Sequence, residues 1–425
     1  METIRIINFI ITAIFAVCYS YQFIYVPVSL WMQHREKKAK KASLSNASGN
    51  ADNALCERNL KNYAVLICAR NEENVIGDLI DSINGQTYKG GVTTFVMADN
   101  CTDNTYGVAI AHGAVAYTRR STDKIGKGYA MEALLGEIKK DFPSGFDGYF
   151  VFDADNVLAP DYIEEMHKCH LEGNEAITSY RNIKNYGDNW ISAGYGLWFL
   201  RETMYLNYAR CKLGSSAAIS GTGFFFSDAV LKDIGGWPFH LLTEDIEFTI
   251  NRVCKGRKIA FCRSAVFYDE QPTSLRQSFR QRMRWARGYF QVFHHYGKAL
   301  IRESFHGNFA AFDMAMNIMP AFFLTTTSIV CNLAYGIIGA VTGGDITIAL
   351  WSMCETIFNA CALLVVLGGI TTVTEWKNIH AGVARKIFSI FSFPLFMLTY
   401  IPVAFAAIFV NPGWKPIKHL SLIHI

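Results

Sequence analysis

Four long runs without charged residues constrain the fold of this chain more than any other feature. They span residues 6–34, 308–344, 346–374 and 387–414, and only Asp313 and Glu355 interrupt them. Each run exceeds the roughly 20 residues that cross a hydrocarbon core. Between the first and second runs lies a charge-rich stretch of about 260 residues, which is long enough to bury a core of its own. The sequence therefore predicts one soluble domain held between membrane segments.

The basic residues that follow the first run predict the orientation. They are Arg35, Lys37, Lys38, Lys40 and Lys41, against one acid, Glu36. Because cytoplasmic flanks of membrane helices carry an excess of Lys and Arg, this flank is expected inside the cell. The chain is thus expected to be a multi-pass protein of the cell membrane, with its soluble domain in the cytoplasm.

The composition excludes several classes of protein. With 51% hydrophobic and 18% charged residues, the chain is not disordered. Its eleven cysteines include no C-x-x-C pair, which disfavours zinc and a disulfide framework. The net charge of +4 lies along juxtamembrane segments and no nucleic-acid recognition module is present, so anionic lipid or phosphate ligands are favoured over nucleic acid.

The soluble stretch alternates strand-like and helical patterns. Strands are expected at 63–69, 92–98 and 149–152, and helices at 75–83, 131–138 and from Pro160 onward. This alternation predicts a parallel-rich α/β sheet, in which ligands bind at the carboxyl ends of the strands. Acidic residues directly after the strands fall at that edge.

Asp153 and Asp155 stand one residue apart at a predicted strand end. Two such carboxylates can converge on a hard divalent cation that also holds a diphosphate. The alternative is a surface turn, because this spacing also arises by chance in a chain of this composition.

Thr243, Glu244 and Asp245 precede an amphipathic helical pattern. They predict a threonine N-cap with acids in the first helical turn. A carboxylate at such a helix start could also deprotonate an acceptor hydroxyl, and the two interpretations are compatible.

Gln281, Arg284 and Trp285 share one helical face at spacing i, i+3 and i+4. An amide, a guanidinium and an indole on one face suit a phosphate-bearing, ring-shaped ligand. The alternative is a helix lying on the membrane surface, because residues 271–302 contain seven Lys or Arg and no acid. Both can hold together.

The motifs resemble, in their order, those of family 2 glycosyltransferases. They are Ala69-Arg70-Asn71-Glu72, Asp99, Gly126-Lys127-Gly128, Asp153-Ala154-Asp155, Thr243-Glu244-Asp245 and Gln281-Arg282-Met283-Arg284-Trp285. More narrowly, the chain resembles membrane-embedded processive synthases of cellulose, hyaluronan, chitin oligosaccharide and poly-N-acetylglucosamine. The resemblance covers about residues 63–296.

The resemblance implies a GT-A fold, which is Rossmann-like, and a role for each matching residue. For the donor, it implies that the uridine is held by Ala69, Asn71, Glu72 and Asp99. It implies that the diphosphate is held by Lys127, Gln281 and Arg284. It further implies that Asp153 holds the nucleotide side and that Asp155 ligates Mg²⁺ or Mn²⁺. For the acceptor, it implies Asp245 as base within the Thr243-Glu244-Asp245 motif, and Trp285, Gly221 and Thr222 as acceptor contacts.

The implied activity is polymerisation of a β-linked polysaccharide from UDP-glucose or UDP-N-acetylglucosamine. One carboxylate base without a second, nucleophilic carboxylate indicates a single inverting displacement, by analogy with hydrolases. Expected partners are the UDP-sugar, the growing polysaccharide and membrane lipid, with an accessory export or regulatory subunit as a further candidate. The alternatives are a transferase that adds one sugar to a lipid and a non-enzymatic transporter or scaffold.

The expected domain division follows from these patterns. It comprises an anchor (1–34), a basic juxtamembrane segment and linker (35–62), a GT-A domain (63–270), interfacial helices with the Gln-x-x-Arg-Trp motif (271–307), a C-terminal membrane region (308–414) and a tail (415–425) whose last six residues resemble a sequencing scar.

Two features of the membrane region bear on export of a product. Polar residues within the runs are candidates for lining a polymer path or for bonding neighbouring helices. They are Asp313, Asn317, Asn332, Glu355 and Asn359. Residues 371–377 only partly match the loop that closes over the nucleotide in cellulose synthases, so a basic inside loop is the favoured interpretation.

Overall fold

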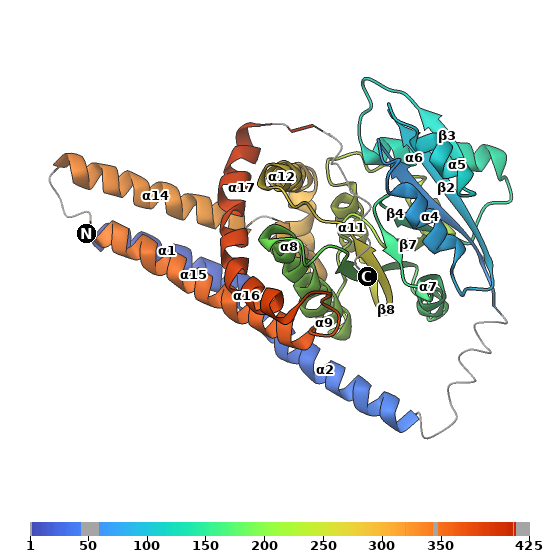
Figure 1. Ribbon diagram of the computed structural model, residues 1–425. Helices are drawn as coiled ribbons and strands as arrows, with labels where there is room; N and C mark the ends of the chain where they lie inside the picture. The colour runs from blue at the N-terminus through green and yellow to red at the C-terminus, as the bar shows by residue number, and fades with distance from the viewer. Residues whose placement is uncertain (1, 44–58, 319, 343–346, 411, 414–425) are drawn as a thin grey trace.

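The computed structural model contains one large sheet flanked by helices, from which long apolar helices extend (Figure 1). It describes residues 2–43, 59–318, 320–342, 347–410 and 412–413. Residues 44–58 of the predicted juxtamembrane segment and linker, and nearly all of the predicted tail, lie outside these described residues. The expected α/β class is confirmed.

The sheet has eight strands in the order β3-β2-β1-β4-β7-β6-β8-β5. They are β1 (Asn62–Ala69), β2 (Gly91–Asp99), β3 (Val115–Arg119), β4 (Gly148–Phe152), β5 (Val157–Leu158), β6 (Ala176–Ile183), β7 (Phe224–Ser227) and β8 (Ala260–Asp269). Strands β3, β2, β1 and β4 pair in parallel, as expected. Strand β7 runs antiparallel to both β4 and β6, so the second half of the sheet is mixed.

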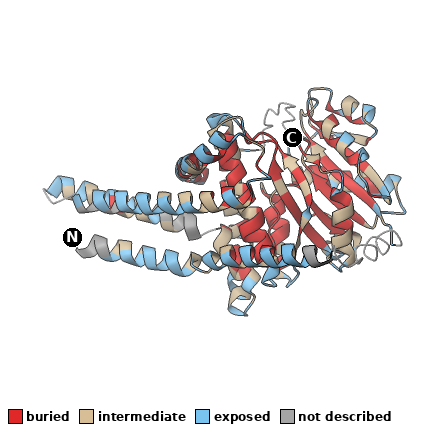
Figure 2. Ribbon diagram, turned by 60° about the horizontal axis from the view of Figure 1, so that its bottom comes forward, coloured by how far each residue is buried: buried red, intermediate tan, exposed pale blue. Residues whose placement is uncertain are grey.

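The alternation of side chains along the strands produces a core on each face of the sheet. Along β1, Tyr63, Val65 and Ile67 pack on one face, and Ala64 and Leu66 pack on the other. Apolar residues at helical spacing cover both faces, from α4 and α7 on the first and from α6 on the second. Figure 2 shows this buried centre.

The helices of the soluble part connect these strands. They are α4 (Ile76–Asn84), α5 (Thr105–Ala111), α6 (Lys127–Asp141), α7 (Tyr162–Leu171), α8 (Trp190–Arg201), the π-helix η1 (Glu202–Asn207), α9 (Tyr208–Lys212), α10 (Asp228–Ile234) and α11 (Glu244–Cys254). Helix α7 begins two residues after Pro160, so the prediction that this proline occupies its first turn was wrong.

The remaining helices are mostly apolar. They are α1 (Glu2–Tyr19), α2 (Gln22–Ser43), α12 (Leu275–Phe305), α13 (Phe309–Ile318), α14 (Pro320–Thr342), α15 (Thr347–Thr374), α16 (Val383–Leu398) and α17 (Tyr400–Phe409). Within the described residues, three stretches are long and apolar enough to cross a membrane: 6–39, 353–374 and 383–409.

The run at 308–344 was expected to form one crossing, but it forms two helices, α13 and α14. Proline is favoured at the first position of a helix and disfavoured inside one, and Pro320 opens α14. The helices α1, α14 and α15 extend together away from the sheet, and most of their length is exposed (Figures 1 and 2).

A buried ionic cluster joins the membrane helices to the soluble part. Two nitrogens on one edge of the Arg210 guanidinium, on α9, contact the two carboxylate oxygens of Asp313, on α13. The Nε–Oδ2 distance is 2.6 Å and the Nη2–Oδ1 distance is 3.1 Å. The hydroxyls of Tyr21 and Tyr25 donate to the same carboxylate at 2.6 and 3.0 Å. We call these four residues the Asp313 cluster.

Two of the residues that could either line a polymer path or bond neighbouring helices do bond neighbouring helices. The Asp313 carboxylate is fully occupied by the Asp313 cluster. Asn332 exchanges side-chain hydrogen bonds with Asn8 of α1, at 2.9 and 3.1 Å. The interpretation as helix-to-helix contacts is therefore correct for these two positions.

The segment after α15 packs against the sheet domain. The Glu375 carboxylate is buried and accepts hydrogen bonds from the Tyr180 hydroxyl of β6 at 2.5 Å and from Asn378 at 2.6 Å. The Asn182 amide donates to the Asn378 carbonyl at 2.8 Å. This turn is thus docked on the soluble domain. The interpretation favoured from the sequence was a basic loop, without such packing.

Candidate functional site

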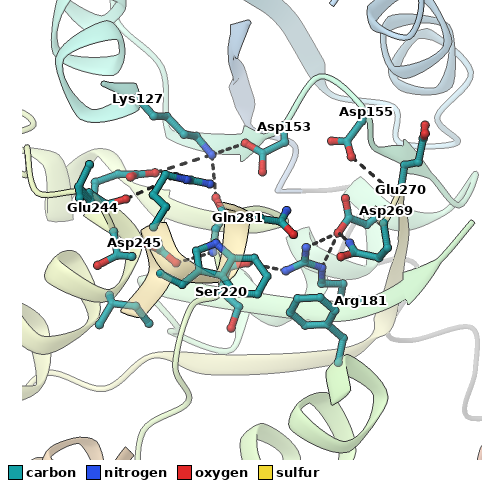
Figure 3. Close-up of a pocket in the computed structure, with 18 of the residues that line it drawn as sticks. Lys127, Asp153, Asp155, Arg181, Ser220, Glu244, Asp245, Asp269, Glu270 and Gln281 are labelled. Atoms are coloured by element: carbon teal, nitrogen blue, oxygen red, sulfur yellow. Dashed lines mark hydrogen bonds and ion pairs between the residues drawn. The ribbon is translucent and has the colours of Figure 1, made fainter. Parts of the chain in front are cut away.

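A cavity opens at the carboxyl ends of the central strands, where most of the predicted site residues meet (Figure 3). Those in its wall are Glu72, Lys127, Asp153, Asp155, Gly221, Thr243, Glu244, Asp245, Gln281, Arg284 and Trp285. They come from the ends of β1 and β4, the start of α6, the segment before β7, the start of α11 and one face of α12. The wall does not include Ala69, Asn71, Asp99 or Thr222.

Lys127 lies at the centre of the donor side. Its Nζ donates to Asp153 Oδ1 at 2.5 Å and to the Gly221 carbonyl at 2.7 Å, and Glu244 Oε1 lies 3.9 Å away. Burial lowers the pKa of Lys127, but the charges of Asp153 and Glu244 raise it by more, so the net shift is upward. The ammonium group therefore stays charged, as a ligand for a diphosphate requires.

Asp245 lies in the first turn of α11 and faces the same segment before β7. Its Oδ2 accepts a hydrogen bond from the Gly221 backbone N–H at 2.6 Å. Burial raises the pKa of Asp245, while the backbone amides of Ile246 and Gly221 lower it in part. A carboxylate whose pKa is raised in this way is a better proton acceptor, which fits the predicted role of base.

Thr243 and Glu244 complete this corner. Thr243 holds the N-cap position of α11, but its side chain makes no capping hydrogen bond, so the predicted side-chain cap was wrong. The Thr243 side chain lies against Gly288 of α12 instead. Burial raises the pKa of Glu244 to about 7, the charge of Lys127 opposes the shift, and Asp245 adds to it. Glu244 is thus partly protonated near neutral pH.

Asp153 and Asp155 provide the hard oxygen ligands that a divalent cation would need. Asp155 accepts hydrogen bonds from the Asn156 side chain and from the Glu270 backbone N–H, both at 3.3 Å. In the part of the chain that the structure describes, no three His, Cys, Asp or Glu side chains converge on one point. This donor set suits Mg²⁺ or Mn²⁺, which are commonly held by one or two carboxylates with the remaining ligands from phosphates and water.

The residues predicted to hold the uridine gather at the adjacent ends of β1 and β2. Asn71, with φ of 58°, accepts a hydrogen bond from the Thr102 backbone N–H at 2.7 Å. Asp99 is buried and pairs with Arg119 Nη1 at 2.5 Å. Ala69 and Glu72 flank Asn71 on the chain, and of these uridine candidates only Glu72 is in the cavity wall.

Thr222 does not reach the acceptor side with Gly221. Gly221 takes a φ of 82°, which favours glycine, and turns its backbone toward the cavity. The Thr222 side chain points inward, is 3% exposed, accepts from the Asp153 backbone N–H at 2.8 Å and donates to Asn156. Its hydroxyl therefore supports the Asp153 turn.

The face of α12 predicted from the sequence turns toward the cavity. Arg284 donates to the Leu242 carbonyl at 3.4 Å, and the Trp285 ring packs edge-on against Tyr195 and Phe199 at centroid distances of 5.9 and 6.1 Å. Arg282 on another face is fully buried and donates to the Phe396 carbonyl at 3.2 Å. Helix α12 is therefore packed among other helices at this point, where a surface helix was the alternative.

Sequence reasoning missed a second acidic group in the cavity wall. Asp269 ends β8 and accepts hydrogen bonds from Arg181, Nε at 2.8 Å, and from Asn156 at 3.0 Å. Burial raises the pKa of Asp269 to about 7, the charge of Arg181 lowers it and Asp155 raises it. A signal was present, because Asp269-Glu270 follows an apolar strand just as Asp153 does. Glu202 and the aromatic residues of α8 were missed as well.

Comparison with known proteins agrees with this geometry. The family described as "Glycosyltransferase like family 2" matches residues 61–288. A β-monoglucosyldiacylglycerol synthase of Nostoc sp. is 26% identical over 315 residues, covering 68% of this chain and 63% of that protein. A poly-β-1,6-N-acetyl-D-glucosamine synthase of Staphylococcus aureus is 23% identical over 250 residues, covering 55% of this chain and 56% of that protein. The chain thus spans less than two thirds of either relative.

A solved structure shares the fold over nearly the whole chain. It is a mannosyltransferase of Pyrobaculum calidifontis in complex with GDP-Man and Mn²⁺, with a TM-score of 0.56 and 14% identity over 94% of this chain and 98% of that one. The soluble part therefore has the GT-A fold implied by the sequence motifs. Because the family match covers more than half of its residues, the chain belongs to glycosyltransferase family 2.

Proposed function

We propose that the protein transfers a hexosyl group from a UDP-sugar, with inversion, to a hydroxyl acceptor at the membrane surface. The observation that carries the proposal is the position of Asp245, which faces the same Gly221 backbone whose carbonyl binds Lys127. The Gly221 backbone therefore bonds both the proposed base, Asp245, and the Lys127 ammonium. This arrangement suits attack by an acceptor hydroxyl on the anomeric carbon of the donor sugar while the diphosphate leaves. Asp153 and Asp155 would hold a divalent cation, which stabilises the leaving diphosphate when bound.

Two acceptors have support. Processive synthesis of a β-linked polysaccharide is favoured by Gln281, Arg284 and Trp285, whose shared face lines the cavity. Addition of one sugar to a lipid is favoured by the Nostoc relative, which is named as a glycolipid synthase. We propose the polysaccharide, made on the cytoplasmic side and translocated, as the first candidate and the glycolipid as the second.

The test is to reconstitute the purified protein with a panel of UDP-sugars and with Mg²⁺ or Mn²⁺. Release of UDP with at least one donor is expected, and the product should carry a β-linkage by NMR. A product longer than a few residues supports polymerisation, and a single lipid-linked sugar supports the second candidate. No UDP release from any donor would contradict the proposal.

Asp155→Ala is expected to weaken binding of the UDP-sugar by at least tenfold, because one of the two carboxylates for a divalent cation is lost. Excess Mn²⁺ should rescue the variant only poorly. Isothermal calorimetry with UDP, at two Mn²⁺ concentrations, measures both effects. Equal UDP affinity of both proteins in Mn²⁺ and in EDTA would remove Asp155 from this role.

A further inference from the structure

Glu202 is an acidic side chain in the cavity wall that no step of the proposed reaction uses. It follows α8 directly and opens the π-helix η1, which runs from Glu202 to Asn207. Short π-helical segments inside α-helices are rare and frequently lie at functional sites. The interruption lies at the point where α8 passes the cavity.

Glu202 and Asp245 bind consecutive residues of one segment. Glu202 Oε1 accepts a hydrogen bond from the Ser220 hydroxyl, and Asp245 Oδ2 accepts one from the Gly221 backbone N–H at 2.6 Å. Consecutive Cα atoms are about 3.8 Å apart, so the two carboxylates approach the cavity from neighbouring points. Arg181 fixes the segment further by donating to the Ser220 carbonyl at 2.9 Å.

The second oxygen of Glu202 has room for a ligand. In the described ranges, no side chain or backbone donor bonds Oε2. The bonds of the Arg181 guanidinium are directed elsewhere, since its Nε and Nη2 bond Asp269 and its Nη1 bonds the Ser220 carbonyl. A half-buried carboxylate oxygen in a cavity is satisfied best by hydroxyl or N–H donors.

Aromatic side chains line the same cavity as this carboxylate. Trp198, Phe199, Trp285 and Tyr289 line the same cavity, from α8 and from α12. Burial raises the pKa of the Tyr289 hydroxyl, and neighbouring charges that include Glu202 and Asp245 raise it further, so this hydroxyl stays a donor. Apolar ring faces beside hydroxyl-binding groups match a pyranose, which has an apolar face and a rim of hydroxyls.

We propose that Glu202 binds a second hydroxyl of the acceptor, and that the acceptor is therefore a glycoside whose terminal pyranose lies against the aromatic residues of α8 and α12. Asp245 would receive the proton of the attacking hydroxyl, and Glu202 would accept a hydrogen bond from another hydroxyl of the same ring. A simple alcohol such as a glycerol head group presents no ring to these contacts. The inference rests on the proposed function and specifies its acceptor.

The first test measures binding to the full-length protein in lipid nanodiscs that contain UDP and Mn²⁺. The probes are hexyl β-glucoside, β-galactoside, β-mannoside and β-N-acetylglucosaminide, with 1-O-hexylglycerol as the alcohol of equal tail length. Saturable quenching of tryptophan fluorescence is expected with at least one glycoside and at least tenfold weaker with hexylglycerol. Equal binding of hexylglycerol, or no binding of any glycoside, would overturn the inference.

Substitutions then separate binding by Glu202 from a purely structural role. Glu202→Gln retains an oxygen for the Ser220 hydroxyl but loses the charge, and Ser220→Ala removes that hydroxyl but keeps the carboxylate. We expect Glu202→Gln to weaken glycoside binding at least tenfold and UDP binding less than twofold, with Ser220→Ala changing glycoside binding much less. Glu137→Gln on exposed α6 is the matched control.

Equal losses in Glu202→Gln and Ser220→Ala would assign Glu202 a structural role and overturn the inference, as would unchanged glycoside binding in Glu202→Gln. UDP release from UDP-sugars, measured separately in the unsubstituted protein, tests the proposed function. A protein that binds glycosides through Glu202 but releases no UDP would contradict only the latter.

Discussion

Asp245→Asn is expected to abolish sugar transfer while UDP binding persists. The amide keeps the shape of the side chain and can still accept the hydrogen bond from Gly221, but it cannot take a proton. General-base catalysis contributes about 10²–10⁴-fold, so kcat should fall by at least about 100-fold. Rates of UDP release and calorimetric UDP affinity measure the two effects, and appreciable residual turnover would remove Asp245 from the role of base.

The pH profile provides an independent check on the same residue. Because burial raises the pKa of Asp245, the protonated, inactive form persists to higher pH than for an ordinary aspartate. As the pH falls, kcat/KM should therefore begin to drop at a higher pH than it would with an ordinary aspartate as the base.

Arg210→Ala is expected to be the most destabilising single change outside the cavity. It leaves Asp313 buried with two tyrosine hydroxyls and no cation. Loss of one partner from a buried ion pair costs about 3–5 kcal/mol. The melting temperature of the purified protein in detergent should fall markedly, and Asp313→Ala should have a similar effect.

The double variant Arg210→Met with Asp313→Leu separates this cost from the value of the pair itself. Since both charges are removed together, it should be more stable than either single variant. Lys140→Ala is the surface control, because its pair with Glu137 is exposed and should contribute less than about 1 kcal/mol. A melting temperature of Arg210→Ala equal to that of Lys140→Ala would contradict the assigned role of the Asp313 cluster.

The first half of the fold could be predicted because its signals are local. The strands at 63–69, 92–98 and 149–152 each combine an apolar run with a polar end, and parallel pairing then brings Asp99 and Asp153 to one edge. Helical spacing alone was sufficient to place Gln281, Arg284 and Trp285 on one face.

The rest depends on contacts between residues far apart in the sequence. Asp269 reaches the cavity only because β8 pairs with β6, and Glu202 reaches it only because a π-helix interrupts an apolar helix. From the sequence, Asp313 could either line a polymer path or bond a neighbouring helix, and the deciding partner, Arg210, lies 103 positions earlier. The residue pattern of one segment does not indicate which distant residues it will contact.

The change from parallel to antiparallel pairing between β4 and β7 has a consequence for how this enzyme could diverge. Most residues proposed to bind the nucleotide come from the part of the sequence up to the end of β4. Most residues proposed to bind the acceptor come from later in the sequence. Substitutions in the later segments could therefore alter what is glycosylated without disturbing recognition of the donor. Descendants of one ancestral gene could in this way acquire new products while they continue to draw on the same cellular pool of activated sugar.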